Sequence, residues 1–123
     1  MVASYNDAET WAPIISDPEI WKPFHLDGNY LVSDQGRIKN KHGRILKGYD
    51  NGLGYKKFEH GTKLGRKYMY KHRAVAFCFC ENDDPTNRTQ VDHLNRDRGD
   101  NKASNLEWVT PKENNRRMRQ MIA

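Results

Sequence analysis

The last third of the chain sets two short apolar runs around a polar loop, and this order constrains the fold more than any other feature. The run "QVDHL" is typical of a short strand, "NRDRGDNKASN" is a polar loop, and "LEWVT" alternates like a second strand. A helix start follows, because Thr110 can cap a helix, Pro111 suits the first helical position and Glu113 completes a capping box. The predicted order is therefore strand, long loop, strand and helix.

Four polar residues occupy fixed places in this frame. Asp92 and His93 are adjacent near the end of the first predicted strand. Asn105 follows His93 by 12 residues, and Asn114 follows Asn105 by 9 residues, on the predicted helix. An apolar residue at position 114 would pack against Val109, so an asparagine there needs a polar partner such as a metal or a neighbouring loop. These four residues are the candidates for a polar site.

The stretch "DHLNRDRGDNKASNLEWVTPKEN" resembles the HNH nuclease motif, the strand-strand-helix metal finger of homing and phage endonucleases. The resemblance implies that His93 is the general base and that Asp92 and Asn114 hold a divalent metal. It also implies that Asn105 braces the loop and ties it to the first strand, which orients His93. Asn115 is the rival for the ligand role, although one step along a helix turns a residue by about 100°.

Two upstream stretches extend the resemblance. The stretch "WKPFHLDGNYLVSDQGRIKN" is similar to a short DNA-binding element that often precedes such motifs, and "HRAVAFCF" resembles the helix that leads into them. The match covers about residues 21–117. It implies a metal-dependent endonuclease that hydrolyses a phosphodiester of double-stranded DNA and leaves 5′-phosphate and 3′-hydroxyl ends. A DNA-binding regulatory module with an inactive nuclease site is the alternative.

The residue types suit this chemistry. Histidine titrates near neutral pH, which suits a general base. Carboxylate and amide oxygens are hard ligands that suit Mg²⁺, with Mn²⁺ as the alternative, and a divalent ion stabilises the charge on the phosphate and the leaving oxygen. Adjacent strand residues point to opposite faces, so Asp92 and His93 share one site only if the strand bends or ends there.

The whole chain predicts an α+β fold, in which a small antiparallel β-sheet region is followed by a ββα-metal (HNH) finger. Residues 30–71 alternate as a small sheet with a turn at Gly36, and residues 72–80 read as a buried helix, with a buried strand as the alternative. We expect an N-terminal arm at residues 1–20, a β-rich DNA-binding element at 21–71, and the helix plus the nuclease motif at 72–123. All three belong to one compact domain.

An excess of basic residues favours a polyanionic partner. The net charge of +5 agrees with double-stranded DNA as that partner, although an ordinary solvated surface is the simpler alternative. Basic side chains in the sheet region and around the nuclease motif are candidates for phosphate contacts. These candidates are Arg37, Lys39, Lys71, Arg73, Arg96, Arg98, Arg116 and Arg117.

Other classes of protein fit the sequence less well. No apolar run is long enough to span a membrane and the N-terminus lacks a signal-peptide pattern, so we expect an intracellular protein of a bacterial or phage-infected cell. A zinc-stabilised interaction domain that uses Cys78 and Cys80 is a further alternative, although these two cysteines supply only two of the four ligands of a structural zinc site. The sequence leaves open whether the protein is a monomer or a homodimer, and whether it nicks DNA or cuts both strands.

Overall fold

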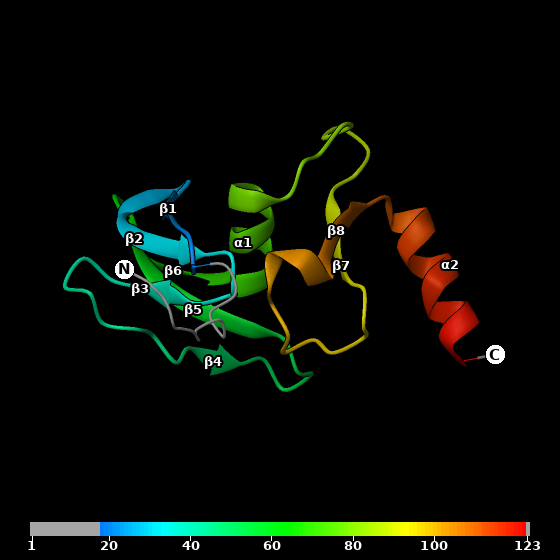
Figure 1. Ribbon diagram of the computed structural model, residues 1–123, viewed down its shortest axis with the longest axis horizontal. Coiled ribbons are helices and arrows are strands. Elements are labelled where there is room, and N and C mark those ends of the chain that lie inside the picture. The colour runs from blue at the N-terminus through cyan, green and yellow to red at the C-terminus, as the bar shows by residue number, and fades with distance from the viewer. Residues whose placement is uncertain (1–17, 123) are drawn as a thin grey trace, which may run out of the picture.

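Three small antiparallel sheets and two α-helices make up the described part of the molecule, residues 18–122 (Figure 1). In this computed structural model, side chains are described up to residue 120. The predicted arm at residues 1–20 therefore falls almost wholly outside the described residues. The predicted division of the chain after residues 20 and 71 stays a prediction.

The first sheet consists of β1 (Trp21–Phe24), β2 (Asp27–Ser33) and β3 (Ile38–Lys39), in that order. The predicted turn joins its last two strands, and the Gly36 N–H donates to the Ser33 carbonyl at 3.0 Å. Gly36 has a φ of +87°, a left-handed conformation that glycine adopts without strain. The prediction of a glycine turn between two short strands is confirmed.

The second sheet consists of β4 (Tyr49–Asp50), β5 (Lys56–Thr62) and β6 (Gly65–Tyr70), in that order. Phe58 and His60 of β5 point inward and are buried, whereas most of β6 is exposed. This is the pattern of an antiparallel sheet with one face on the core and one face toward solvent. The outer face is therefore open to a partner.

The expectation of one sheet over residues 30–71 is wrong in detail, because the structure divides this region into two sheets. The connecting segment, residues 40–48, contains Gly43 and Gly48, whose φ values are +81° and +76°. Left-handed glycines interrupt a strand, so the hydrogen-bonded ladder does not continue from β3 to β4. Only an isolated bridge between Lys39 and Ile45 links this segment back to β3 among the described residues.

The helix α1 (Lys71–Phe79) confirms the helical reading of "HRAVAFCFC". It lies between the N-terminal sheets and the C-terminal hairpin (Figure 1). Ala74, Val75 and Ala76 are fully buried. Their cluster includes apolar side chains from both sheets, namely Phe24, Val32, Ile38 and Phe58. The same cluster contains Val91, Leu106 and Trp108, so the core joins the two N-terminal sheets to the C-terminal hairpin.

The C-terminal unit contains β7 (Gln90–His93), a short 3₁₀ turn (Ala103–Asn105), β8 (Leu106–Val109) and α2 (Pro111–Ile122). The predicted order of strand, loop, strand and helix is confirmed. In Figure 1, α2 stands at the far end of the molecule from the N-terminal sheets. Within the described residues, neither helix combines the length and the apolarity that a membrane crossing requires.

The start of α2 has the predicted capping box. The Glu113 N–H donates to the Thr110 hydroxyl at 3.0 Å, and the Thr110 N–H donates to the Glu113 carboxylate at 2.9 Å. This second hydrogen bond is the largest cause that lowers the pKa of Glu113 below its ordinary value. The capping box fixes where the helix begins and so places Asn114 in its first turn.

Replacement of Gly36 by alanine is expected to destabilise the fold strongly. A Cβ atom at this position would lie 2.7 Å from both the carbonyl carbon and the oxygen of Asn101. Left-handed strain alone costs an alanine about 1–2 kcal/mol, and the backbone overlap adds to it. We expect the free energy of unfolding to fall by more than about 2 kcal/mol, measured by urea denaturation.

The matched control is Gly43→Ala. Gly43 has a φ of +81°, but an added Cβ would meet nothing within 4 Å. This variant should lose only about 1–2 kcal/mol, from backbone strain. Equal losses in the two variants would show that the contact between Gly36 and Asn101 is unimportant for stability.

Candidate active site

Asp92 and His93 point to opposite faces of the β7–β8 hairpin, as strand geometry requires. Asp92 faces α2, where the Arg117 Nη1 donates to its Oδ2 at 2.9 Å. His93 faces α1, and its ring centre lies 5.0 Å from that of His72. The hairpin is therefore placed between the two helices, with one candidate residue toward each.

Both residues nevertheless border the same cavity, of about 210 Å³. This is possible because β7 ends at His93, so the cavity can open onto both faces of the strand. The expectation that the strand must bend or end there is confirmed. Asn114 also lines the cavity, whereas Asn105 does not. The remaining lining residues are Tyr55, Val91, Arg96, Arg98 and Met118.

His93 is held firmly within the protein. Only 4% of its surface is exposed, and its Nε2 lies 2.8 Å from the Asn101 Oδ1. Its ring packs against the rings of His72 and Tyr55, at centroid distances of 5.0 and 6.0 Å. No described residue forms a hydrogen bond with Nδ1. One ring nitrogen is therefore engaged by the protein and the other is available to a ligand.

Two guanidinium groups hold the buried Asp92 carboxylate. The Arg96 Nη1 lies 3.0 and 3.1 Å from its two oxygens, and the Arg117 Nη1 bridges Asp92 and Glu107 at 2.9 Å from each. Hydrogen bonds to Asp92 first, and then to Glu107, raise the pKa of Arg117 above its ordinary value. The Asp92 carboxylate in the cavity wall is therefore neutralised by the Arg96 and Arg117 guanidinium groups.

Arg96 approaches Asp92 from a left-handed backbone conformation. Its φ is +68°, which costs a residue other than glycine about 1 kcal/mol or more. Its N–H donates to the His93 carbonyl at 3.1 Å and closes a tight turn just after β7. This turn directs the Arg96 side chain back toward β7, where it contacts Asp92. Arg96, predicted to contact DNA, is thus placed at the cavity itself.

Asn105 braces the loop between the strands. Its Oδ1 accepts the Asn95 N–H at 3.0 Å, and its Nδ2 donates to the Asn95 Oδ1 at 3.0 Å and to the Asp100 carbonyl at 2.8 Å. These bonds tie the loop to itself, not to the first strand as expected. The side chain bonded to His93 is Asn101 instead, because the loop curls back over the end of β7.

Asn114 and Asn115, the two candidates on α2 for the role of metal ligand, have different surroundings. The Asn114 Nδ2 donates to the Gln90 Oε1 at 2.8 Å, so its amide oxygen has no hydrogen-bond donor among the described residues. Asn115 is exposed and does not line the cavity. The structure therefore brings Asn114, and not Asn115, to the cavity that Asp92 and His93 border.

These residues fit a hard divalent cation. Asp92 offers carboxylate oxygens and Asn114 an amide oxygen, which are ligand types that Mg²⁺ accepts. The Arg96 and Arg117 guanidinium groups already neutralise this carboxylate, so a divalent cation would have to displace one of them from an Asp92 oxygen. Among the described residues, no three His, Cys, Asp or Glu side chains converge on one point. Water or a phosphate oxygen would therefore complete the coordination, as is usual for Mg²⁺.

The two thiols are engaged elsewhere. The Cys78 Sγ contacts the Pro23 carbonyl at 3.5 Å, and the Cys80 Sγ contacts the Ala103 carbonyl at 3.6 Å. Burial raises the pKa of both thiols. Because a zinc ligand must be a thiolate, this setting favours packing over metal binding.

His72 lies beside the base candidate but remains neutral. Burial, followed by the charges of His93 and Arg73, lowers the pKa of His72 to about 3. Its Nδ1 is buried and has no hydrogen-bond partner among the described residues. A neutral imidazole cannot donate a proton as imidazolium near pH 7, so His72 serves the packing around His93.

The other basic residues predicted to contact DNA differ in their surroundings. Lys71 is buried and its Nζ donates to the Lys47 carbonyl at 2.9 Å, so it supports the fold. Arg98 lies over the Tyr55 ring at 4.7 Å, beside the cavity. Arg116 is exposed on α2. Arg98 and Arg116 are therefore accessible to the phosphate backbone of a DNA molecule.

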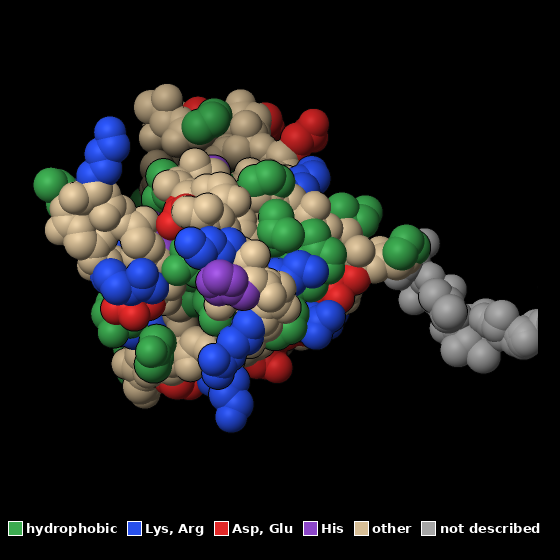
Figure 2. Space-filling view, turned by 90° about the vertical axis from the view of Figure 1, so that its left-hand side faces the viewer, with side chains coloured by type: hydrophobic (Ala, Val, Ile, Leu, Met, Phe, Trp, Pro, Cys, Tyr) green, Lys and Arg blue, Asp and Glu red, His purple; other side chains and the backbone are tan. Residues whose placement is uncertain are grey.

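Three further candidates stack on aromatic rings. Arg37 and Lys39 lie over the Trp21 ring at 5.6 and 4.2 Å, and Arg73 lies over the Trp108 ring at 5.5 Å. Figure 2 shows the end of the molecule that lies at the left of Figure 1, where Lys and Arg side chains gather with acidic side chains among and around them. The positive charge on this face is thus interspersed with negative charge.

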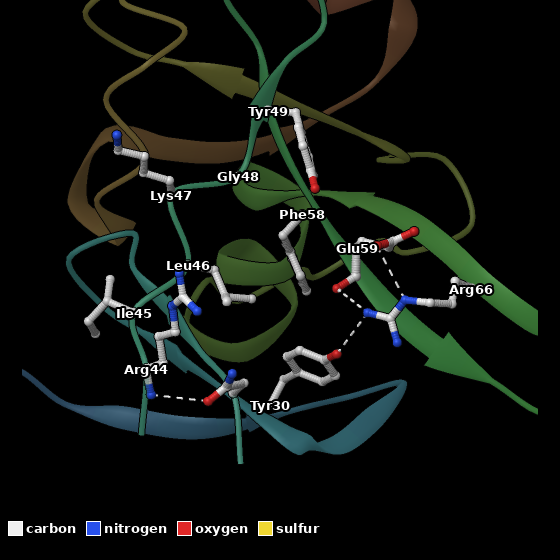
Figure 3. Close-up of a pocket in the computed structure, with 11 residues that line it drawn as sticks. Tyr30, Arg44, Ile45, Leu46, Lys47, Gly48, Tyr49, Phe58, Glu59 and Arg66 are labelled. Atoms are coloured by element: carbon white, nitrogen blue, oxygen red, sulfur yellow. Dashed lines mark hydrogen bonds and ion pairs between the residues drawn. The ribbon is translucent and has the colours of Figure 1, made fainter. Parts of the chain in front are cut away.

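A larger cavity, of about 610 Å³, lies between the second sheet and the segment after β3 (Figure 3). The Arg66 guanidinium reaches across it to the Tyr30 hydroxyl at 3.2 Å and pairs with Glu59. Phe58 lies on its inner side. None of its described lining residues is a histidine, so this cavity lacks the predicted histidine base and is not the site of the predicted chemistry.

Sequence reasoning missed two residues that contact His93. Asn101 lies in a polar loop without periodicity, so nothing marked it as a partner of His93. Tyr55 precedes β5 and meets His93 only through the fold, since 38 positions separate them in the sequence. Contacts of this kind depend on tertiary structure and leave no local signal.

Comparison with known proteins identifies the motif. Residues 83–116 match the family model HNH_3, described as HNH endonuclease. An uncharacterized HNH endonuclease of Acanthamoeba polyphaga mimivirus is 38% identical over 99 residues, which cover 78% of this chain. The chain belongs to the HNH endonuclease family. The fold class predicted from the sequence agrees with this assignment.

A characterised HNH protein resembles the chain over most of its length. The DNA endonuclease I-HmuI of Bacillus phage SP01 is 33% identical over 96 residues, covering 76% of this chain and 54% of the relative. A solved structure titled as DNA binding and cleavage by the HNH homing endonuclease I-HmuI matches with a TM-score of 0.74 and 31% identity. That match covers 83% of this chain and 59% of the other.

The HNH chain is short beside its relatives. It spans 25% of the first mimivirus protein and 28% of a second HNH endonuclease from the same virus, which is 34% identical over 93 residues. The alignments with these two relatives cover 78% and 75% of this chain, so they extend beyond the matched residues 83–116.

Proposed function

We propose that this HNH protein is a metal-dependent DNA endonuclease of the homing or phage type, which hydrolyses a phosphodiester of double-stranded DNA. The observation that carries the proposal is the single cavity bordered by Asp92, His93 and Asn114. A base candidate, a carboxylate and an amide oxygen come from two separate elements and meet there.

His93 is proposed as the general base. Its ring is fixed by Asn101, His72 and Tyr55, while Nδ1 has no hydrogen-bond partner among the described residues. A fixed imidazole that borders an open cavity is suited to accept the proton of an attacking water molecule. Asn105 supports His93 indirectly, because its side chain fixes the loop on which Asn101 lies.

Asp92 and Asn114 are proposed to hold the metal, most simply Mg²⁺, with Mn²⁺ as the alternative. A divalent ion bound there would supply charge neutralisation at the scissile phosphate and at the leaving oxygen. Arg96 and Arg117 already contact Asp92, so they lie within reach of a phosphate that approaches the same carboxylate. The cavity thus gathers positive charge around the place where the phosphate must sit.

DNA contact is proposed along the exposed basic side chains beside the cavity and on the outer face of the second sheet. Arg98 lines the cavity, Arg116 is exposed on α2, and Lys57 lies over the Tyr68 ring at 4.6 Å on the open sheet face. Arginine, lysine and tyrosine are residues that commonly contact the phosphate backbone. We place this activity inside an infected or host cell, since the relatives named above come from viruses.

The test is a cleavage assay on supercoiled plasmid and on DNA of the native host, with Mg²⁺, with Mn²⁺ and with EDTA. Cleavage that needs the metal supports the proposal, and nicked circles against linear product separate single-strand from double-strand cleavage. Light scattering distinguishes a monomer from a homodimer. DNA binding without cleavage, on DNA that includes the native target site, would instead support the regulatory module with an inactive site.

A further inference from the structure

Among the described residues, Asn101 is the one whose side chain lies within hydrogen-bonding distance of the His93 ring. Its side chain is buried, with 6% of the residue exposed, and its Oδ1 lies 2.8 Å from the His93 Nε2. His93 itself is 4% exposed, so water is largely excluded from this hydrogen bond. A buried hydrogen bond between two side chains fixes their relative orientation more firmly than an exposed one.

The chemistry of the two groups decides which nitrogen carries the proton. An amide oxygen accepts hydrogen bonds and cannot donate them, so a neutral His93 must carry its hydrogen on Nε2. The lone pair then lies on Nδ1, the nitrogen without a hydrogen-bond partner among the described residues. Fixing the tautomer of a histidine through its second nitrogen is a general way to present the first one for chemistry.

The N-terminal sheet holds Asn101 in place. The turn between β2 and β3 lies directly against it, because a Cβ on Gly36 would be 2.7 Å from the Asn101 backbone. The Ala103 N–H donates to the Asp34 carbonyl of the same turn at 2.8 Å. The loop that carries Asn101 is thus fastened on both sides, by the turn and by the Asn105 side chain.

We propose that Asn101 is the positioning residue of His93. It holds the imidazole in the Nε2–H tautomer and leaves Nδ1 as the proton acceptor toward the cavity. The use of this tautomer in catalysis rests on the function proposed above, whereas the orientation itself is a property of the protein alone. The first sheet contributes to the site through the turn that supports Asn101.

The test of the orientation is nuclear magnetic resonance of the metal-free protein with ¹⁵N-labelled histidine, at a pH above the titration range of histidine. The His93 signals are assigned by their loss in His93→Ala. The wild-type protein is expected to show the Nε2–H tautomer. Asn101→Leu should shift His93 toward a mixture of tautomers, and Asn101→Asp, which keeps an acceptor oxygen, should restore the wild-type pattern.

Lys102→Ala is the matched control, since Lys102 is the next residue on the same loop and its side chain pairs with the half-buried Asp100 carboxylate, not with Asn101 or His93. In the Lys102→Ala variant, the tautomer of His93 should be the same as in the wild-type protein. A wild-type spectrum with the proton on Nδ1 would overturn the proposal without any variant. An unchanged tautomer in a folded Asn101→Leu protein would overturn it as well.

Cleavage kinetics separate this inference from the proposed function. Asn101→Leu should lower kcat by about 10–100-fold with little change in KM for DNA, and Asn101→Asp should recover most of that loss. If wild-type protein shows the Nε2–H tautomer but cuts no DNA, the nuclease proposal fails while the positioning role stands. If Asn101→Leu cuts at the wild-type rate, the positioning role fails while the nuclease proposal stands.

Discussion

Replacement of His93 by alanine is expected to lower the rate of DNA cleavage by about 10²–10⁴-fold, the range that general-base catalysis contributes. DNA binding should persist, because His93 is 4% exposed and offers little surface to the backbone of DNA. Cleavage of plasmid in Mg²⁺ and a gel-shift assay in EDTA measure the two effects separately. Cleavage at the wild-type rate would remove His93 from the role of base.

Two controls belong with this experiment. His42→Ala removes a histidine that is exposed on the segment after β3 and does not line the cavity, so its activity should match the wild type. His93→Gln keeps most of the volume of the side chain and so limits the loss of packing against His72 and Tyr55. A similar loss of activity in the alanine and glutamine variants would show that the chemistry, and not the packing, was removed.

Replacement of Asp92 by asparagine is expected to raise the Mg²⁺ concentration needed for cleavage and to lower the rate at low Mg²⁺ by about 100-fold or more, since metal stabilisation of the transition state is worth several kcal/mol. Asparagine keeps the shape and the acceptor oxygen but removes the charge that faces Arg96 and Arg117. A Mg²⁺ titration of the cleavage rate gives the result. An unchanged titration curve would place the metal elsewhere.

Glu107→Gln is the matched control for Asp92→Asn. Glu107 lies opposite Asp92 in the β7–β8 ladder and also accepts a hydrogen bond from Arg117, but it does not line the cavity. Its replacement should leave the Mg²⁺ dependence near that of the wild type. Asn114→Ala should raise the Mg²⁺ concentration needed for cleavage, whereas Asn115→Ala should not, because Asn114 borders the cavity and Asn115 does not.

Local sequence signals predicted the C-terminal unit well. The order of β7, loop, β8 and α2 follows from apolar alternation and from the capping box at Thr110 and Glu113, which the structure contains. Such signals act over a few residues, because backbone hydrogen bonds and caps join near neighbours in the chain. The glycine turn at Gly36 and the helix α1 were predictable for the same reason.

Tertiary structure decided what surrounds the candidate site. The sequence placed Asp92 beside His93 but did not show that Arg117, 25 positions away, would pair with the carboxylate. It did not show that Lys71 would be buried, or that residues 30–71 would divide into two sheets. Each of these outcomes depends on which elements pack together, and residues far apart in the chain leave no periodic signal of that packing.

The sequence by itself determined the family, the order of the C-terminal elements and the four candidate residues with their spacing. Only the tertiary structure decided that three of the four, Asp92, His93 and Asn114, border one cavity, and that Asn101 and not Asn105 contacts the histidine. The physical reason is that spacing fixes the position of a residue along its own element. The meeting of a strand end, a helix turn and a loop is set by burial of the core that α1 shares with the sheets.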